Sequence, residues 1–132
     1  GLSFKPNTDD VRDAPAIEII HLLNGEGAEV RAFDPVAGGR AKDELGDRFT
    51  LAVSPVEAAR DADAVLITTE WNEFRALDWA AMLNAMRGNL LVDGRNMHDP
   101  DRMSELGFEY YDMGRSLRVP EVETSASVAA GV

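Results

Sequence analysis

The sequence predicts an α/β fold that is built around a mostly parallel sheet. Apolar runs that are typical of strands alternate along the chain with segments that repeat apolar residues at helical spacing. The run at residues 62–69 (ADAVLITT) is apolar and β-branched and is bounded by charges, without the alternation of a half-exposed strand. This pattern is typical of a central parallel strand that is buried on both faces.

The composition of the 132 residues fits one globular domain, with 45% hydrophobic and 28% charged residues. The 13 basic and 24 acidic residues give a net charge of −11, which argues against nucleic acid as a partner. No apolar run is long enough to span a membrane, so we expect no membrane partner. The chain has no cysteine, which excludes disulfides and cysteine nucleophiles and favours a cytoplasmic location. His21 and His98 are too far apart in sequence to suggest a metal site.

The first third of the chain predicts the end of a strand, then a helix and a second strand. Residues 1–5 are expected to end a first strand that is truncated, because about five apolar residues would precede its glycine. The chain is therefore expected to be a fragment. Asp13 and Pro15 predict the start of a helix, with Asp13 as its cap, and Asn24-Gly25 predicts its end. Residues 28–33 alternate apolar and polar residues, which predicts a strand.

The remaining segments continue the alternation of helix and strand. Ser54 and Pro55 predict a capped helix that runs through Ala59. The whole order predicts a Rossmann-like three-layer sandwich, with residues 1–115 as one domain and residues 116–132 as a flexible tail of small and polar residues. The other expected elements are strands at residues 49–53, 89–92 and 108–111, and helices at residues 37–45, 78–86 and 100–106.

Three polar clusters follow predicted strands, at residues 5–12, 70–74 and 93–96. The carboxyl ends of parallel strands lie at one edge of a sheet, so the three clusters are expected to converge there. They bring three cations to a strongly acidic chain, which predicts an anionic ligand, and the planar guanidinium of arginine suits phosphate. The alternative is that these are ordinary solvated loop charges. The cations are Lys5, Arg12 and Arg95.

Other polar and aromatic residues have a chemical and a structural interpretation, and the structural one is favoured for each. Glu70 fits a general base, but a lone carboxylate is more often structural. Trp71 and Phe74 fit stacking on a base, but core packing is the favoured role. We also favour capping and pairing with Arg12 over metal binding for Asp9, Asp10 and Asp13, a flexible loop over a ligand site for residues 37–40, a turn role for His98 and a surface position for His21.

Four segments resemble the C-terminal, UDP-binding domain of the UDP-glucose/GDP-mannose dehydrogenases, and most closely its UDP-glucose-oxidising members. They are residues 4–12 (FKPNTDDVR), 28–35 (AEVRAFDP), 69–71 (TEW) and 93–95 (DGR). The match in order and spacing extends from residue 1 to about residue 115. The four segments together are specific, although each alone is short.

The resemblance implies a function. The family oxidises the C6 alcohol of a nucleotide sugar to a carboxylate in two NAD-dependent steps, with UDP-glucose giving UDP-glucuronate. It uses an NAD-binding domain, a central domain with a catalytic cysteine, and the C-terminal domain that this chain resembles. By that match Phe4 and Lys5 would contact the UDP-sugar, Arg95 its nucleotide part, and Arg12 would reach towards the NAD at the domain interface.

The resemblance also implies what the chain lacks. The catalytic cysteine and the NAD-binding turn belong to the other two domains, so no residue here is expected to be catalytic and the chain alone is expected to be inactive. Its expected partners are a UDP-sugar and those two domains, with a homo-oligomer left open. Two alternatives stay open: a non-catalytic α/β module for interaction or oligomerisation, and a dehydrogenase domain for GDP-mannose or an N-acetylated sugar.

Overall fold

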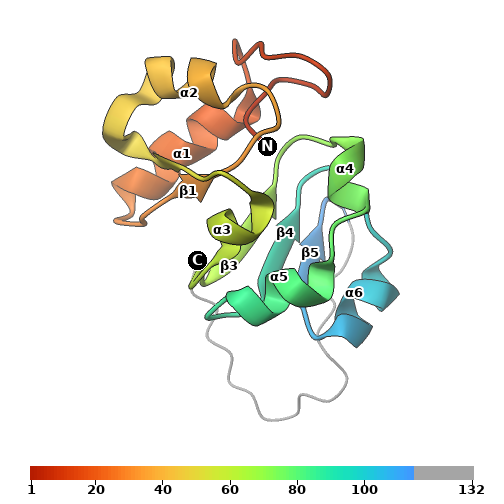
Figure 1. Cartoon of the computed structure of the whole chain (residues 1–132). Helices are drawn as coiled ribbons and strands as arrows, with labels where there is room; N and C mark the ends of the chain where they lie inside the picture. The colour runs from red at the N-terminus through yellow and green to blue at the C-terminus, as the bar shows by residue number, and fades with distance from the viewer. Residues whose placement is uncertain (115–132) are drawn as a thin grey trace.

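A computed structural model describes residues 1–114, which form two small parallel sheets with helices packed around them (Figure 1). This confirms the predicted α/β fold. The expected tail, residues 116–132, lies outside the described residues. None of the described helices has the length and hydrophobicity that crossing a membrane requires. The helices are α1 (Pro15–Gly25), α2 (Gly38–Leu45), η1 (Gly46–Arg48), α3 (Pro55–Ala59), α4 (Asn72–Arg75), α5 (Trp79–Ala85) and α6 (Pro100–Leu106), and the strands are β1 (Arg31–Ala32), β2 (Thr50–Leu51), β3 (Ala64–Ile67), β4 (Leu90–Asp93) and β5 (Glu109–Asp112).

The first sheet pairs β1 with β2 in parallel, with Ala32 opposite Leu51. Both strands are two residues long, much shorter than the predicted segments 28–33 and 49–53. A short ladder is expected here, because β2 is exposed along its length and β1 has β2 as its only partner strand among residues 1–114.

The second sheet has the order β3-β4-β5, and all of its pairs are parallel. Ile67 lies opposite Asp93, and Asp93 lies opposite Asp112, so the three strands end level with one another. The prediction that residues 62–69 form the central strand is wrong for the described residues: β3 is an edge strand, and β4 is central. The apolar run of β3 nevertheless has the composition of a strand with a neighbour on each side.

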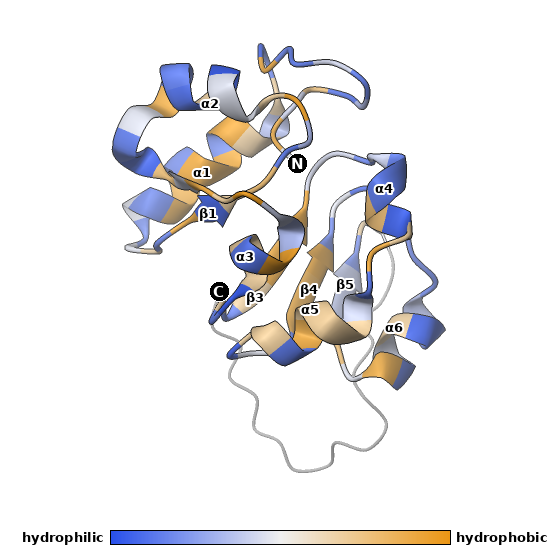
Figure 2. Cartoon of the chain, viewed as in Figure 1, coloured by the Kyte–Doolittle hydropathy of each residue, from blue (hydrophilic) through white to orange (hydrophobic). Residues whose placement is uncertain are grey.

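Each sheet has its own hydrophobic core. The core of the β1-β2 sheet includes Leu2 and Ile20. The core of the β3-β4-β5 sheet includes Leu91, Phe108 and Tyr110, all fully buried. Figure 2 shows hydrophobic residues on β4 and along α1, and a mixture of hydrophilic and hydrophobic residues along α2 and α6.

The helix starts follow the sequence closely, with one exception. Ser54 caps α3 as predicted, because its Oγ accepts a hydrogen bond from the Glu57 amide at 3.1 Å. Asp78 caps α5 in the same way. The predicted Asp13 cap of α1 is wrong: Ala14 precedes the helix, and Asp13 has a φ of 58°, outside the extended region that an N-cap residue takes.

Two short segments differ from the sequence-based expectation. For residues 37–40 the predicted helix at residues 37–45 is confirmed and the predicted flexible loop is wrong, because Gly38 begins α2 and packs closely on the side chain of Leu51. A Cβ atom at Gly38 would lie 2.8 Å from a methyl carbon of Leu51, so a larger residue here would require the end of the Leu51 side chain to shift. The four-residue helix α4 has no predicted counterpart, because one helical turn is too short to show apolar periodicity.

Candidate functional site

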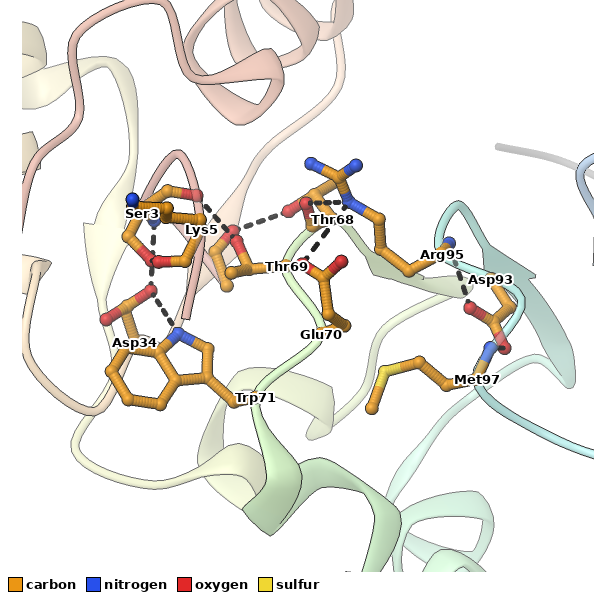
Figure 3. Close-up of polar contacts among 11 residues, drawn as sticks. Ser3, Lys5, Asp34, Thr68, Thr69, Glu70, Trp71, Asp93, Arg95 and Met97 are labelled. Atoms are coloured by element: carbon orange, nitrogen blue, oxygen red, sulfur yellow. Dashed lines mark hydrogen bonds and ion pairs between the residues drawn. The ribbon is translucent and has the colours of Figure 1, made fainter. Parts of the chain in front are cut away.

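Four chain segments meet at the carboxyl edge of the strands (Figure 3). They are residues 1–5, Asp34 after β1, residues 68–71 after β3, and residues 93–97 after β4. Hydrogen bonds connect each segment to the next. The predicted convergence at one sheet edge is confirmed for the clusters at residues 70–74 and 93–96, which Glu70 and Arg95 join, whereas residues 1–3 rather than the predicted cluster 5–12 make the contacts on the N-terminal side.

Asp34 is the hydrogen-bonding centre on the β1 side. Its Oδ2 accepts from the amides of Leu2 at 2.7 Å and Ser3 at 3.0 Å and from Trp71 Nε1 at 3.2 Å. Its Oδ1 accepts from the amides of Val36 and Ala37 at the start of α2. Burial alone would raise the pKa of this carboxyl, but the backbone hydrogen bonds lower it, and the net pKa lies below its usual value. The residue therefore holds the N-terminal segment, α2 and the β3 side together as an ionised carboxylate.

The N-terminal segment is held against the end of β3 by two threonines. Thr69 Oγ1 donates to the Ser3 carbonyl at 2.8 Å, and Thr68 Oγ1 donates to the Gly1 carbonyl. A methyl group at Gly1 would lie 2.5 Å from Cβ of Thr69, so this close approach requires glycine. Residues 1–3 therefore have a fixed position between Asp34 and β3, although the structure assigns no strand to them.

Arg95 lies on the other side of the β3 end. Its Nε donates to the Thr68 carbonyl at 3.0 Å and lies 3.9 Å from Oε1 of Glu70. Among residues 1–114, no hydrogen bond is recorded for its two terminal nitrogens, and 30% of the side chain is exposed. A guanidinium held in this way can offer both terminal nitrogens to an anion. Glu70 is thus a partner of Arg95, which agrees with a structural role.

Asp93 fixes the turn that carries Arg95. It is fully buried, and its Oδ1 accepts from the Arg95 amide at 3.1 Å. Its Oδ2 accepts from the amides of Met97 at 2.8 Å and His98 at 3.1 Å and from the Tyr110 hydroxyl at 2.6 Å. One carboxylate therefore ties the turn at the end of β4 to β5 and sets the backbone from which Arg95 extends.

His98 belongs to the core behind this turn. Its ring meets Trp79 edge-on, with 5.0 Å between the ring centroids, and only 8% of the residue is exposed. Burial lowers the pKa of the imidazole below its usual value, so the ring is neutral at pH 7. The turn position predicted for it is confirmed, but the burial was not predicted. Trp71 and Phe74 are also buried, as predicted, and His21 is exposed on α1.

Phe4 and Arg12 lie at a second position, across a loop that the Phe4 amide closes by donating to the Asp10 carbonyl at 2.8 Å. Phe4, Asp10, Arg12 and Asp13 border a shallow hollow of about 230 Å³. Arg12 Nε and Nη2 donate to the two carboxylate oxygens of Asp10 at 3.0 and 2.9 Å. The paired guanidinium holds the pKa of the Asp10 carboxyl at about 2. The predicted pairing of Asp10 with Arg12 is confirmed, while Asp13 has no capping role.

Lys5 follows the anchored residues 1–3. The residue is exposed, and its carbonyl accepts a hydrogen bond from Ser3 Oγ at 2.8 Å. Within the part of the chain that the structure describes, its ammonium group has no ion pair. Asp9 pairs with Arg40 at 3.0 Å, and residues 1–114 contain no group of three acidic or histidine side chains that would hold a metal ion.

The structure thus divides the four predicted site residues. Lys5 and Arg95 extend from segments that are bonded to opposite sides of Thr68–Thr69, whereas Phe4 and Arg12 share the outer hollow. The sequence interpretation missed Asp34 and Asp93 as the residues that hold these segments. The available signal was their common position, since each is an aspartate that directly ends an apolar strand segment.

Comparisons with known proteins find a matching family model and similar sequences. Residues 1–100 match the sequence model of the UDP-glucose/GDP-mannose dehydrogenase family, UDP binding domain. The chain is 47% identical over 115 residues to a UDP-glucose 6-dehydrogenase of Rhizobium meliloti, with 87% of this chain and 26% of the relative covered. It is 45% identical over 120 residues to the UDP-glucose 6-dehydrogenase of Pseudomonas aeruginosa, again with 87% and 26% covered. The chain therefore spans about a quarter of the length of these relatives.

Solved structures show the same similarity. A UDP-glucose dehydrogenase from Pyrobaculum islandicum matches with a TM-score of 0.64 and 39% identity, over 74% of this chain and 21% of that chain. A UDP-D-ManNAc dehydrogenase from Pyrococcus horikoshii matches with a TM-score of 0.68 and 28% identity, over 87% of this chain and 24% of that chain.

Proposed function

The chain belongs to the UDP-glucose/GDP-mannose dehydrogenase family as its UDP-binding domain, and we propose that it holds the nucleotide part of UDP-glucose while a longer enzyme oxidises the sugar to UDP-glucuronate with NAD. Glucose is favoured as the sugar because the two relatives described above are named UDP-glucose 6-dehydrogenases. An N-acetylated sugar is the second candidate, supported by the similarity to the UDP-D-ManNAc dehydrogenase.

The observation that carries the proposal is the position of Arg95. The guanidinium is anchored through Nε on the Thr68 carbonyl, which leaves its terminal nitrogens for a phosphate. The turn beneath it is held by the buried carboxylate of Asp93, so little side-chain freedom is lost when a ligand binds. We assign the diphosphate to Arg95 and Lys5.

Phe4 is proposed to contact the same UDP-sugar from the outer hollow. The residue is 47% exposed, so its ring is accessible to a ligand. An aromatic ring at the rim of a site suits contact with a base or a sugar face. In this arrangement the ligand extends over the exposed Lys5, with Arg95 at one end and Phe4 at the other.

NAD is proposed to be bound mainly by a domain outside these 132 residues. Arg12 is the candidate contact from this chain, since its side chain is 87% exposed and Asp10 holds it in one orientation. The pair fits a peripheral contact to an anionic cofactor, because the guanidinium keeps one terminal nitrogen available to solvent. The NAD-binding and central domains are the proposed partners, a homo-oligomer is compatible with this arrangement, and the cysteine-free sequence favours a cytoplasmic location.

A ligand panel tests the proposal directly. UDP, UDP-glucose and GDP are titrated into the isotopically labelled 132-residue chain and followed by amide chemical shifts. We expect saturable binding of UDP and UDP-glucose, with the largest shifts in residues 3–5 and 93–97. Equal affinity for GDP, or shifts confined to other segments, would contradict the assignment.

A further inference from the structure

The turn that carries Arg95 has a second attachment, on the β5 side. Asn96 directly follows Arg95 in the chain, and Met113 directly follows β5. Asn96 Nδ2 donates a hydrogen bond to the Met113 carbonyl at 3.1 Å, and the Met113 amide donates to Asn96 Oδ1 at 2.7 Å. We call this pair of hydrogen bonds the Asn96 clasp. Through it, one side chain joins the turn after β4 to the residue after β5.

The Asn96 clasp stands where a backbone partner for Met113 would be. The β4-β5 ladder ends with Asp93 opposite Asp112, and among residues 1–114 it gives Met113 no partner residue on β4. The chain leaves the sheet at this point, because Gly94 donates its amide to the Ile67 carbonyl on the β3 side. An asparagine side chain offers both an acceptor and donors, so it can replace the two polar groups of a neighbouring strand. The clasp therefore extends the ladder by one position.

Two requirements apply to the residue at position 96. Its φ is 53°, in the left-handed region that asparagine adopts more readily than most other residues with a side chain. Its side chain must also accept from the Met113 amide and donate to the Met113 carbonyl. Aspartate would keep the acceptor but would place its second oxygen opposite that carbonyl, and glycine would keep only the backbone conformation. Asparagine meets both requirements.

The clasp supports the one part of the turn that the Asp93 carboxylate does not hold. That carboxylate accepts from the amides of Arg95 and Met97, which lie on either side of Asn96. The Asn96 amide reaches only the Asp93 carbonyl, at 3.5 Å, which is long for a hydrogen bond. Asn96 is therefore held mainly by its side chain on Met113. Because one planar peptide unit joins Arg95 to Asn96, a displacement of Asn96 also moves the backbone of Arg95.

We propose that Asn96 is a positioning residue for Arg95, and that its clasp on Met113 holds the Arg95 guanidinium in the orientation that binds the diphosphate of a UDP-sugar. The part of this proposal that concerns the ligand rests on the proposed function, whereas the effect of the clasp on Arg95 does not. Both bonds of the clasp are exposed, so water competes with them. We therefore expect the clasp to act on the orientation of Arg95 more than on the stability of the whole chain.

Hydrogen exchange of the Arg95 Nε–H group without any ligand is the first part of the test. Asn96→Gly removes the clasp and suits the left-handed backbone, and Met113→Pro removes the amide that donates to Asn96. The matched controls are Met113→Ala, which keeps that amide, and Asn89→Gly, which removes a side-chain bond to the Gly107 carbonyl at the amino ends of β4 and β5. We expect exchange about threefold faster or more in both clasp variants and unchanged in both controls.

UDP titration is the second part, carried out in the wild-type chain and in Arg95→Ala. Asn96→Gly should raise the dissociation constant for UDP about threefold to tenfold in the wild-type chain. In the Arg95→Ala chain the same substitution should change it less than about twofold, because a positioning residue has no effect once the residue that it positions is removed. Asn89→Gly should leave the UDP affinity unchanged.

Three results would overturn the proposal. They are a wild-type exchange rate at Arg95 in either clasp variant, an equal change in Asn89→Gly, and a loss of UDP affinity in Asn96→Gly that is just as large in the Arg95→Ala chain. If Arg95→Ala by itself binds UDP as tightly as the wild type, the proposed function is wrong. The exchange measurement then still decides whether Asn96 positions Arg95.

Discussion

The indole Nε1 of Trp71 donates a hydrogen bond to Oδ2 of Asp34 at 3.2 Å, and this contact joins the two halves of the molecule. Trp71 belongs to the core of the β3-β4-β5 sheet, whereas Asp34 follows β1. The same oxygen also accepts from the amides of Leu2 and Ser3. One buried carboxylate therefore sets the position of the N-terminal segment relative to both sheets, and with it the position of Lys5.

Asp34→Asn is expected to destabilise the chain by about 3 kcal/mol, because an amide nitrogen would face backbone donors in a buried position. Asp43→Asn on the exposed surface of α2 is the matched control and should change the free energy of unfolding by less than about 0.5 kcal/mol. Urea unfolding measures both. Equal midpoints for the two variants would contradict the structural role of Asp34.

The same variant should also change how the free energy of unfolding depends on pH below pH 5. The pKa of Asp34 is lowered in the folded chain. Its contribution to stability is therefore complete when the pH is above the pKa of an unperturbed aspartate, about 3.9, and is lost as the pH falls below that value. Measured by urea unfolding between pH 5 and pH 2.5, the wild-type chain should lose more stability than Asp34→Asn. Parallel curves for the two proteins would contradict the lowered pKa.

The fold was largely predictable from the sequence, because local signals specify most of it. Ser54 and Pro55 mark the start of α3, and apolar runs mark β3 and β4. The Asp13 cap was wrong, because the backbone of Asp13 takes a positive φ that side-chain type alone does not reveal. The place of β3 in the sheet depends on which neighbours pair with it, which is not a local property.

The candidate site was predictable in outline but not in its supporting contacts. Parallel strand ends share one edge, which is enough to place the segments that carry Lys5 and Arg95 at the end of β3. The hydrogen bonds from the Leu2 amide to Asp34 and from the Tyr110 hydroxyl to Asp93 join residues that are 32 and 17 positions apart in the chain. Such partners follow from the tertiary arrangement and leave no spacing pattern in the sequence.

Tyr110→Phe tests whether Asp93 positions Arg95. Loss of the 2.6 Å hydrogen bond should loosen the turn at the end of β4 and weaken UDP binding about threefold to tenfold. The exposed neighbour gives a matched control, Tyr111→Phe, which should leave the affinity unchanged. Chemical shifts of Arg95 and Met97 report on the turn. A Tyr110→Phe variant that loses stability yet keeps its UDP affinity would show a structural role without a positioning one.

Arg12→Ala separates the NAD contact proposed for Arg12 from UDP binding. Arg12 lies with Asp10 and is not bonded to Thr68, Glu70 or Arg95, so UDP affinity of the 132-residue chain should change less than twofold. In the full-length enzyme the same substitution should raise KM for NAD and leave KM for the UDP-sugar nearly unchanged. The opposite pattern of KM values would move Arg12 into the substrate site.

The central claim is that Arg95 holds the diphosphate of a UDP-sugar, and UDP titration of Arg95→Ala tests it most directly. Arg102→Ala, which changes an exposed arginine on α6, is the matched control. Loss of a charge-assisted contact to phosphate should raise the dissociation constant for UDP at least about tenfold in Arg95→Ala, with no change in the control. An Arg95→Ala chain that stays folded and binds UDP as tightly as the wild type would contradict the account.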